Sequence, residues 1–290
     1  MGRRRRPAHV HGLAIVDKPA GVTSHDVVGM LRRRLGERRI GHAGTLDPSA
    51  TGVLVVGIGS VTRLLRFVGE GRKRYTGEVV FGVETDTLDA DGAVVATHDM
   101  TGLTVKQART VAEQLTGDIE QVPPMVSAIR VEGRRLHDLA REGIEVERAP
   151  RPVTVHRFDV VETPDPMVLA IDVECSSGTY VRTLAADLGR LLGGGGHLRR
   201  LRRVAVGAFS IDEAAAPDDC AVLPPIESVR GMARVDVDTD TAAQIGNGTV
   251  LPAPAGEGPW AMVGPDDRLL AVYERVGGGR AKPAVVLVPG

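Results

Sequence analysis

A loop near the start of the chain, Gly41 to Gly52, gathers several polar or reactive side chains between glycines and a proline, in the order Gly-His-Ala-Gly-Thr-Leu-Asp-Pro-Ser-Ala-Thr-Gly. Asp47 precedes Pro48, and a proline disfavours the helical conformation of the residue before it, so the carboxylate is presented from an extended backbone. A carboxylate held in this way could take part in catalysis. Asp-Pro also starts many ordinary turns, and an Asx turn is the alternative for Asp47.

Sequence signatures of other catalytic classes are absent. The chain has no P-loop, no dinucleotide-binding fingerprint, no His-Glu-x-x-His and no Gly-x-Ser-x-Gly. Asp86, Asp89 and Asp91 resemble a calcium-binding loop only faintly, because their spacing is wrong and no Glu occupies the twelfth position. Calcium binding is therefore not expected.

Other metal sites and cofactors are not expected either. His9 and His11 are close in sequence but have no third ligand nearby. The only cysteines, Cys175 and Cys220, provide neither a disulfide framework nor a zinc cluster. We expect a protein of a reducing compartment that works without metal or cofactor.

Charge is distributed unevenly along the 290 residues, although the formal net charge is only -1. Residues 1–74 hold 15 Lys and Arg against 5 Asp and Glu, and residues 182–203 hold 6 against 1. The intervening and C-terminal stretches are acidic. Two basic segments in an acidic background indicate a local phosphate-binding surface. The excess of Arg over Lys also fits GC-rich coding, but GC-rich coding does not explain the clustering.

Periodicity and turn residues predict strands and helices in an irregular order, which favours an α+β fold over a doubly wound sheet. The expected strands are residues 12–16, 53–58, 74–83, 152–162 and 167–175. The expected helices are residues 24–36 with Ser24 as the cap, a short helix capped by Ser60, a helix opened by the Thr104-x-x-Gln107 capping box, and residues 179–192. The eight aromatic residues are so few that any Tyr within a motif draws attention.

The ends of the chain differ from its middle. Arg3 to Arg6 form a basic arm over residues 1–11, followed by Pro7 rather than by the apolar core of a signal peptide. No apolar run reaches membrane-spanning length, so we expect a cytoplasmic protein that does not bind membranes. From about residue 231 the sequence changes to short strands, Gly/Pro turns and acidic residues, which places a domain boundary there.

The loop around Asp47 closely resembles the G-H-x-G-x-L-D-P-x-A-T-G signature of bacterial tRNA pseudouridine-55 synthases, the TruB family. Other segments match family motifs in the expected order, and the resemblance spans roughly residues 10–210. These segments are Asp17-Lys18-Pro19 with Gly21, Thr23 and Ser24, then Lys73-Arg74-Tyr75, then Gln121-Val122-Pro123-Pro124 with Ser127-Ala128, then Cys175 to Leu184, and finally Gly196-His197 to Leu201-Arg202-Arg203.

The resemblance implies a pseudouridine-synthase catalytic domain over residues 12–230, with a mixed, largely antiparallel sheet flanked by helices. It implies a small β-rich, PUA-like domain over residues 231–290. The implied activity is isomerisation of uridine 55 in the T-arm loop of tRNA to pseudouridine, by base flipping and an Asp-dependent move of the glycosidic bond from N1 to C5. We expect a monomer, because one chain can hold one tRNA arm.

The resemblance also assigns residues to roles. Asp47 is the catalytic carboxylate, Arg182 pairs with it, and Tyr75 stacks on the uracil and is a candidate for proton transfer at C5. His42, Tyr180 and Leu201 match positions that contact the displaced nucleotides or the base. Without the resemblance, Tyr75 and Leu201 would be ordinary core residues, and Arg182 a surface cation.

Arginines in the basic segments are the expected phosphate contacts, with a solvated charged face as the alternative. They are Arg32, Arg33, Arg38, Arg39, Arg74, Arg199, Arg202 and Arg203, together with Arg3 to Arg6, Arg34, Arg72 and Arg200.

Four positions depart from the family pattern. Ala43 stands where Thr is common, Val126 and Arg130 replace Tyr and Lys after the double proline, and His137 stands where an aromatic residue is frequent. The alternatives to an isomerase are a non-catalytic tRNA-binding or tRNA-folding module and a glycoside hydrolase. A glycoside hydrolase normally needs two carboxylates, and these motifs supply one with an arginine.

Overall fold

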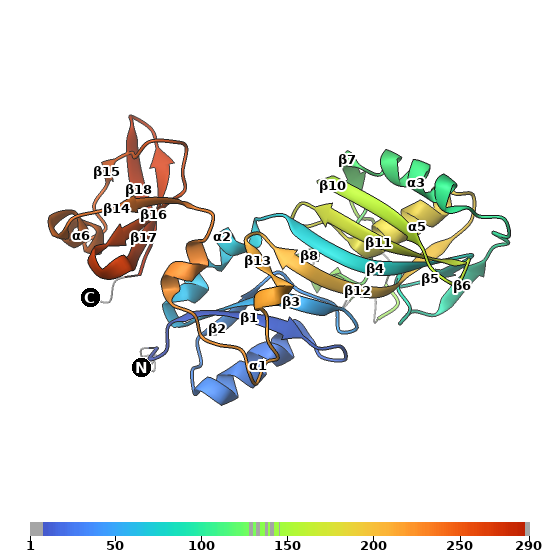
Figure 1. The fold of residues 1–290 in the computed structure, drawn as a ribbon, viewed down its shortest axis with the longest axis horizontal. Coiled ribbons are helices and arrows are strands. Elements are labelled where there is room, and N and C mark those ends of the chain that lie inside the picture. Colours follow the sequence, from blue (N-terminus) through green and yellow to red (C-terminus); the bar gives the residue numbers. More distant parts are fainter. Residues whose placement is uncertain are drawn as a thin grey trace. The chain divides into compact units, whose positions relative to one another are not determined.

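The computed structural model describes residues 8–287, apart from residues 128–129, 132–133, 137–138, 140–141 and 145. The basic arm Arg3 to Arg6 and the departing residue His137 lie outside the described residues. The chain forms two compact units, each built from separate stretches of sequence (Figure 1). The first unit takes in the described residues 8–47, 53–70 and 206–287, and the second takes in residues 48–52 and 71–205.

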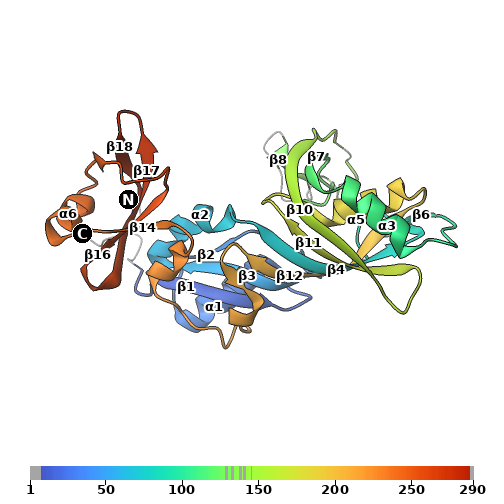
Figure 2. The ribbon, with the colours of Figure 1, turned by 45° about the horizontal axis from the view of Figure 1, so that its top comes forward.

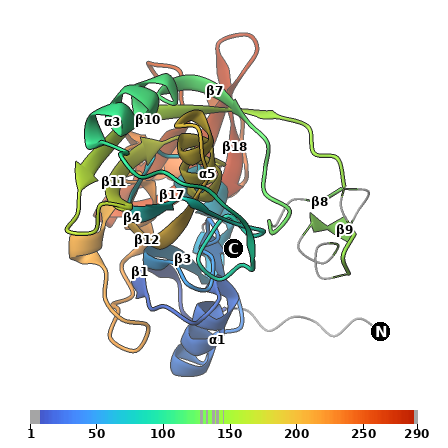
Figure 3. The ribbon, with the colours of Figure 1, turned by 90° about the vertical axis from the view of Figure 1, so that its right-hand side faces the viewer.

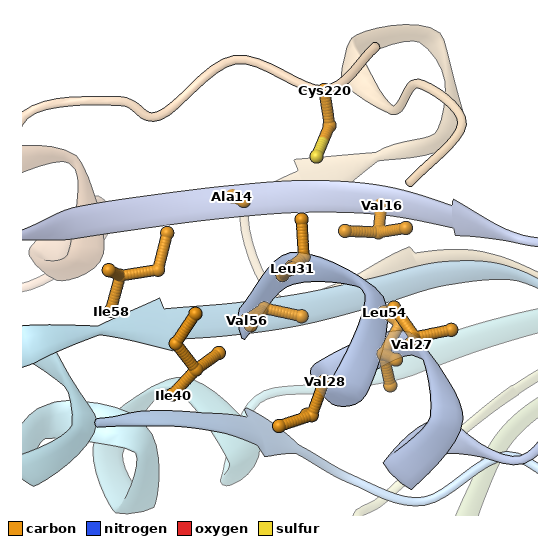
Figure 4. Close-up of a cluster of buried hydrophobic side chains, with 10 residues drawn as sticks. All are labelled: Ala14, Val16, Val27, Val28, Leu31, Ile40, Leu54, Val56, Ile58 and Cys220. Carbon is orange, nitrogen blue, oxygen red and sulfur yellow. The ribbon is translucent and has the colours of Figure 1, made fainter. Parts of the chain in front are cut away.

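The N-terminal part of the first unit packs one helix against strands. Its elements are β1 (Gly12–Lys18), α1 (Ser24–Leu35), β2 (Ile40–Ala43) and β3 (Thr51–Ile58). The side of α1 that carries Val27, Val28 and Leu31 is buried against apolar side chains of β1 and β3 (Figure 4). The helix expected from the sequence is therefore confirmed, and its apolar side is the one that packs.

The first residue of α1 is not its cap. Thr23 caps the helix: its hydroxyl accepts a hydrogen bond from the Asp26 N–H at 3.0 Å, and the Asp26 carboxylate accepts one from the Thr23 N–H at 2.8 Å. The prediction that Ser24 caps α1 is wrong, because the capping box lies one residue earlier. Ser60 does not cap a helix either, since Ile58 precedes the 3-10 turn η1 (Gly59–Leu64) without a side-chain cap.

The other face of β1 and β3 is covered by residues distant in sequence. After η1 the chain forms the short helix α2 (Leu65–Gly69), and much later β13 (Phe209–Ser210) and η2 (Ile211–Glu213). Leu13 and Val53 share a buried cluster with Val206 and Phe209. Segments far apart in the sequence thus contribute to one core.

The C-terminal part of the first unit is a five-stranded sheet with the order β14-β16-β17-β18-β15. The strands are β14 (Ala233–Asp236), β15 (Leu251–Pro252), β16 (Trp260–Gly264), β17 (Arg268–Val276) and β18 (Arg280–Val286), with helix α6 (Thr239–Gly246) and the 3-10 turns η3 (Pro225–Val229) and η4 (Pro265–Asp267). Trp260 and Tyr273 are fully buried in its core. A small β-rich C-terminal domain is therefore present as expected.

This C-terminal sheet also shares a core with the earlier part of its unit. Leu64 of η1 and Val229 of η3 are buried together with Leu269 and Val272 of β17. Arg63 donates to the carbonyl of Val286 in β18. The compact unit therefore extends across residue 231, and the boundary there stays a prediction.

The second unit is built on a sheet with the strand order β12-β4-β11-β10-β7. These strands, side by side in Figures 1 and 2, are β4 (Lys73–Phe81), β7 (Gly117–Gln121), β10 (Arg151–Glu162), β11 (Val168–Cys175) and β12 (Gly196–Val206). Neighbours β4, β11, β10 and β7 pair antiparallel, whereas β12 pairs in parallel with the start of β3. The expected mixed, largely antiparallel sheet is confirmed.

Among the described residues of the second unit, helices α3 (Val105–Gln114) and α5 (Val181–Leu191) and two short hairpins accompany this sheet. Helix α3 packs against β10 and against α5 (Figure 3). The capping box of Thr104 and Gln107 opens α3 as predicted. The hairpins are β5 (Val83–Thr85) with β6 (Val94–Thr97), and β8 (Arg130–Val131) with β9 (Arg134–Arg135). Among the described residues, no helix is long and apolar enough to cross a membrane.

Candidate active site

The backbone next to Asp47 is fixed by α1. The preceding residue, Leu46, is buried, and its N–H donates to the Ser24 hydroxyl at 2.9 Å. The same hydroxyl donates to the Leu46 carbonyl at 3.2 Å. Ser24 is itself buried, so both backbone groups of Leu46 have a partner that water does not replace. This contact presents the half-buried Asp47 carboxylate from a fixed position.

The loop that carries Asp47 connects two paired strands. β2 and β3 are antiparallel, with His42 opposite Val56. The expectation of a loop over all of residues 41–52 is therefore wrong at both ends, where residues 41–43 belong to β2 and residues 51–52 belong to β3. His42 is half-buried on this strand, five residues before Asp47.

Gly52 closes the loop for a steric reason. Its φ is +102°, and a Cβ built there would lie 2.1 Å from the carbonyl oxygen of Arg203 on β12. Gly52 pairs with Arg203 and Thr51 with Arg202 where β3 and β12 run in parallel. Only glycine permits this close approach of the two backbones.

Tyr75 and Arg74 occupy opposite faces of β4, because side chains alternate along a strand. Tyr75 is 7% exposed and shares its face with the buried Lys73 and Val79. Arg74 is exposed on the other face, where its guanidinium holds the Asp172 carboxylate through two hydrogen bonds of 2.9 and 2.5 Å. The hydrogen bond to Asp172 raises the pKa of Arg74 and lowers the pKa of the carboxyl. Arg74 therefore points away from Tyr75, although the two residues belong to the same motif.

Arg182, the second residue of α5, is buried among polar partners. Its side chain is 4% exposed, with Nη1 3.0 Å from the Thr87 carbonyl oxygen and 3.4 Å from Oδ2 of Asp89. Nη2 donates to the Val126 carbonyl at 2.7 Å. A buried guanidinium needs a compensating anion and acceptors for its N–H groups, and these three residues provide them. The surface-cation alternative for Arg182 is thereby excluded.

Asp89 is a functional candidate that the sequence reasoning missed. Its loop is internally braced: Oδ1 accepts from the Thr87 hydroxyl at 2.5 Å and from the Asp91 N–H at 3.2 Å. The backbone of the loop is also tied to β12, since the Ala90 N–H donates to the Leu198 carbonyl at 2.9 Å. Oδ2 of Asp89 therefore faces Arg182 from a fixed position. The sequence signal for Asp89 is its place among Asp86, Asp89 and Asp91, a pattern that was interpreted only as a poor match to a calcium-binding loop.

Lys73 of β4 and Arg203 of β12 are both buried, and their charges lie close enough to interact. Lys73 is 7% exposed and donates to the Ser177 hydroxyl at 2.9 Å, and Arg203 is 1% exposed. Burial and then the charge of Arg203 lower the pKa of Lys73. The depth of Arg203 speaks against the phosphate contact expected for it.

The remaining expected phosphate contacts fall into two groups. Arg33, Arg38 and Arg39 are exposed around the end of α1. The others have internal acceptors: Arg32 donates to the Ile40 carbonyl, Arg34 to the carbonyls of Pro217 and Cys220, Arg72 to Glu174, Arg199 and Arg200 approach Glu78, and Arg202 donates to the Thr51 hydroxyl. Arg72, Arg199 and Arg200 are exposed as well, but each has a carboxylate partner, so Arg33, Arg38 and Arg39 are the better candidates for binding phosphate.

The expected site residues belong to both units. Tyr75, Tyr180, Arg182 and the half-buried Leu201 of β12 are in the second unit, and Asp47 is in the first. Within the described chain, no three His, Cys, Asp or Glu side chains are grouped as metal ligands would be.

Cys175 is not expected to act as a nucleophile or a metal ligand at neutral pH. Cys175 is fully buried, and this burial raises the pKa of its thiol to about 11. A protonated, inaccessible thiol is a poor nucleophile and a poor metal ligand.

Three models of known protein families match this chain. The model of the TruB family pseudouridylate synthase N-terminal domain matches residues 32–181. The tRNA pseudouridylate synthase B C-terminal domain matches residues 182–219, and the C-terminal model of tRNA pseudouridine synthase II matches residues 232–288. Together these matches take in the segments that hold Asp47, Tyr75, Arg182 and Leu201.

Individual relatives are similar in sequence to this chain over nearly its full length. The tRNA pseudouridine synthase B of Arthrobacter sp. (strain FB24) is 46% identical over 297 residues, covering 96% of this chain and 97% of that protein. That of Rhodococcus jostii (strain RHA1) is 46% identical over 288 residues, covering 96% and 94%. A solved structure of a Cbf5-Nop10-Gar1 complex contains a similar fold, with a TM-score of 0.74 at 22% identity over 96% of this chain and 85% of that one. The chain belongs to the TruB family of pseudouridine synthases.

Proposed function

We propose that this chain isomerises uridine 55 in the T-arm loop of tRNA to pseudouridine. The relatives that it matches over nearly their full length are named tRNA pseudouridine synthases. The single observation that supports catalysis most directly is the burial of Arg182 on α5 among hydrogen-bond acceptors and a carboxylate. A module that only binds RNA has no need of an arginine enclosed in this way, because phosphate contacts require exposed cations.

Asp47 is the catalytic carboxylate in this proposal. It acts ionised, either attacking the nucleotide or assisting cleavage of the bond between uracil N1 and the sugar. Arg182 pairs with it and keeps its pKa low, because a nearby cation favours the charged form of a carboxyl group. Asp89 in turn holds Arg182, from a loop braced by Thr87 and by β12.

The flipped uridine is held by residues of both motifs around Asp47 and Arg182. Tyr75 stacks on the uracil and is placed to carry the proton that leaves C5 when the new glycosidic bond forms. Tyr180 and Leu201 complete the base pocket. His42 contacts nucleotides displaced when the base leaves the stack, which costs a few kcal/mol. The base detaches at N1, turns and rejoins at C5, so atoms and electrons balance without an external reactant. In this proposal a single chain carries out the reaction as a monomer.

The direct test is to incubate the purified chain with an unmodified tRNA transcript and to map pseudouridine by position. The proposal requires one new pseudouridine, at position 55, and none in a transcript with cytidine at that position. Modification elsewhere, or tRNA binding without any product, would contradict it. The second result would leave a tRNA-binding or tRNA-folding module.

Ser24→Ala should weaken both the fold and the turnover. It removes the hydroxyl that serves the buried N–H and carbonyl of Leu46, which costs about 1–3 kcal/mol of unfolding free energy. Because Asp47 is the next residue, we expect turnover to fall about tenfold even well below the melting temperature. Chemical denaturation and initial rates measure the two effects. Ser60→Ala is the control, and equal behaviour of both variants would refute this anchoring role.

Arg38 and Arg39 should contribute to tRNA binding through phosphate contacts. Both are exposed next to α1, whereas Arg203 is buried and Arg74 is held by the Asp172 carboxylate. Replacing both by Ala should weaken tRNA binding and reduce the slope of log Kd against log salt by roughly one for each phosphate that the protein no longer neutralises. Arg268→Ala, an exposed arginine of β17, is the matched control. An unchanged slope in the double variant would remove these residues from the interface.

A further inference from the structure

Helix α5 begins without a side-chain cap of its own. Its N-cap residue is Tyr180, whose side chain makes no capping hydrogen bond. Helices α1, α3 and α6 are instead capped by Thr23, Thr104 and Asp238. An aromatic N-cap leaves the first turn less well defined than a Ser, Thr or Asp would. Yet this turn of α5 carries Arg182.

A buried glutamine fixes the backbone at this point. Gln121 is 1% exposed, and its Oε1 accepts a hydrogen bond from the Tyr180 N–H at 2.9 Å. Its Nε2 donates to the Tyr180 carbonyl at 3.1 Å, and the same carbonyl accepts the Leu184 N–H, the first hydrogen bond of α5. Tyr180 has extended dihedral angles, φ −98° and ψ 107°. The amide of Gln121 thus bonds Tyr180 as a residue of a neighbouring antiparallel strand would.

Gln121 is itself held in place by the sheet. It is the last residue of β7 and lies opposite Arg151 of β10. The chain then continues through two buried prolines to Val126, whose carbonyl accepts from Nη2 of Arg182. The segment 121–126 therefore contacts the start of α5 twice, at the Tyr180 backbone and at the Arg182 guanidinium. Of these contacts, only the one made by Gln121 depends on a side chain of the segment.

We propose that Gln121 is a positioning residue, which orients Tyr180 and Arg182 by fixing the first turn of α5. This inference rests on the proposed function, because it takes the roles of Tyr180 and Arg182 from there. Gln121 touches neither substrate nor reacting atoms in this role. An amide is required, because it donates and accepts at once, whereas a carboxylate only accepts and a thioether does neither well.

The test compares Gln121→Met and Gln121→Glu with the wild-type chain, all at full length and with the same tRNA. Both side chains are close to Gln in length, so packing is largely kept. Gln121→Glu keeps the acceptor for the Tyr180 N–H but places an ionised oxygen beside the Tyr180 carbonyl. We expect kcat to fall about 10²-fold in both variants, the scale for a displacement of about 1 Å at a catalytic group, with KM for tRNA changed less than about threefold. Amide hydrogen exchange at Leu184 should become faster in both variants, and exchange at Tyr180 should become faster in Gln121→Met.

Gln107 offers a matched control in the same unit. Its Oε1 accepts from the N–H and the hydroxyl of Thr104, the N-cap of α3, at 2.9 and 2.7 Å. Gln107→Met removes a glutamine from another helix start, and Gln107→Glu preserves that capping box. Both should keep kcat near the wild-type value, even where Gln107→Met lowers the melting temperature.

Several results would overturn the proposal. One is a folded Gln121→Met or Gln121→Glu with kcat within about twofold of wild type. Another is a fall in kcat of a Gln121 variant that is no larger than the fall in a Gln107 variant with the same melting temperature. If neither Gln121 variant folds, the residue serves folding rather than positioning. A wild-type chain that forms no pseudouridine would refute the proposed function as well, whereas an active wild type with unaffected variants refutes the positioning role alone.

Discussion

Asp47→Asn is expected to abolish pseudouridine formation while tRNA affinity stays within about threefold of wild type. The substitution keeps the size of the side chain and the backbone contact of Leu46 with Ser24, but removes the negative charge that the reaction needs. Turnover should fall by at least about 10⁴-fold, as it does when other enzymes lose a nucleophile. Product formed in a single-turnover reaction, measured beside a tRNA-binding curve, tests both halves of this prediction.

An exposed aspartate of the same unit provides the control for this substitution. Asp219 is exposed in the same unit, so Asp219→Asn should change neither turnover nor affinity. Near-normal product from Asp47→Asn would exclude Asp47 as the catalytic carboxylate. Equal loss of binding and turnover would instead indicate damage to the loop.

Arg182→Lys should produce the second-largest loss, about 10²- to 10³-fold in kcat, although it conserves the charge. The planar guanidinium contacts the Thr87 carbonyl, the Asp89 carboxylate and the Val126 carbonyl in three directions at once. An ammonium group cannot reproduce this fork of hydrogen bonds. A loss of this size is typical when one electrostatic contact to the reacting groups is removed. Initial rates at saturating tRNA measure it.

Another arginine of the same helix serves as the control for Arg182→Lys. Arg190 is exposed and pairs with Asp187 at 2.6 Å. Arg190→Lys should leave kcat and the melting temperature unchanged, because exposed ion pairs contribute little to stability. If Arg182→Lys also kept full kcat, its guanidinium would be a structural anchor only.

Much of the fold was predictable because local rules determine it. Strands β4, β10 and β11 follow from alternation and from turns, and the capping box of Thr104 and Gln107 opens α3 as predicted. The error at Ser24 arose because a serine at a helix start has two uses. Its hydroxyl bonds a residue 22 positions away, and no local pattern shows such a partner.

The site itself was predictable only in part, since burial depends on tertiary packing. Arg203 lies in a basic run and was expected at a phosphate, yet it is 1% exposed. Asp89 and Gln121 lie in different motifs from Arg182 and Tyr180, and only the folded chain brings them into contact. A charge pattern describes the composition of a surface, but it cannot separate a cation in solvent from one enclosed by backbone carbonyls.

The first unit is built from stretches that are far apart in the sequence, so its core can be completed only late in synthesis. Leu13 of β1 exchanges two backbone hydrogen bonds with Leu223, and the clusters around β1 and β3 include Val206 and Cys220. The apolar strands made first by the ribosome must therefore wait for some two hundred later residues, whereas residues 71–205 form a nearly continuous unit that can fold meanwhile. The emerging chain thus passes through a stage in which its earliest strands stay partly uncovered until most of the chain has been made.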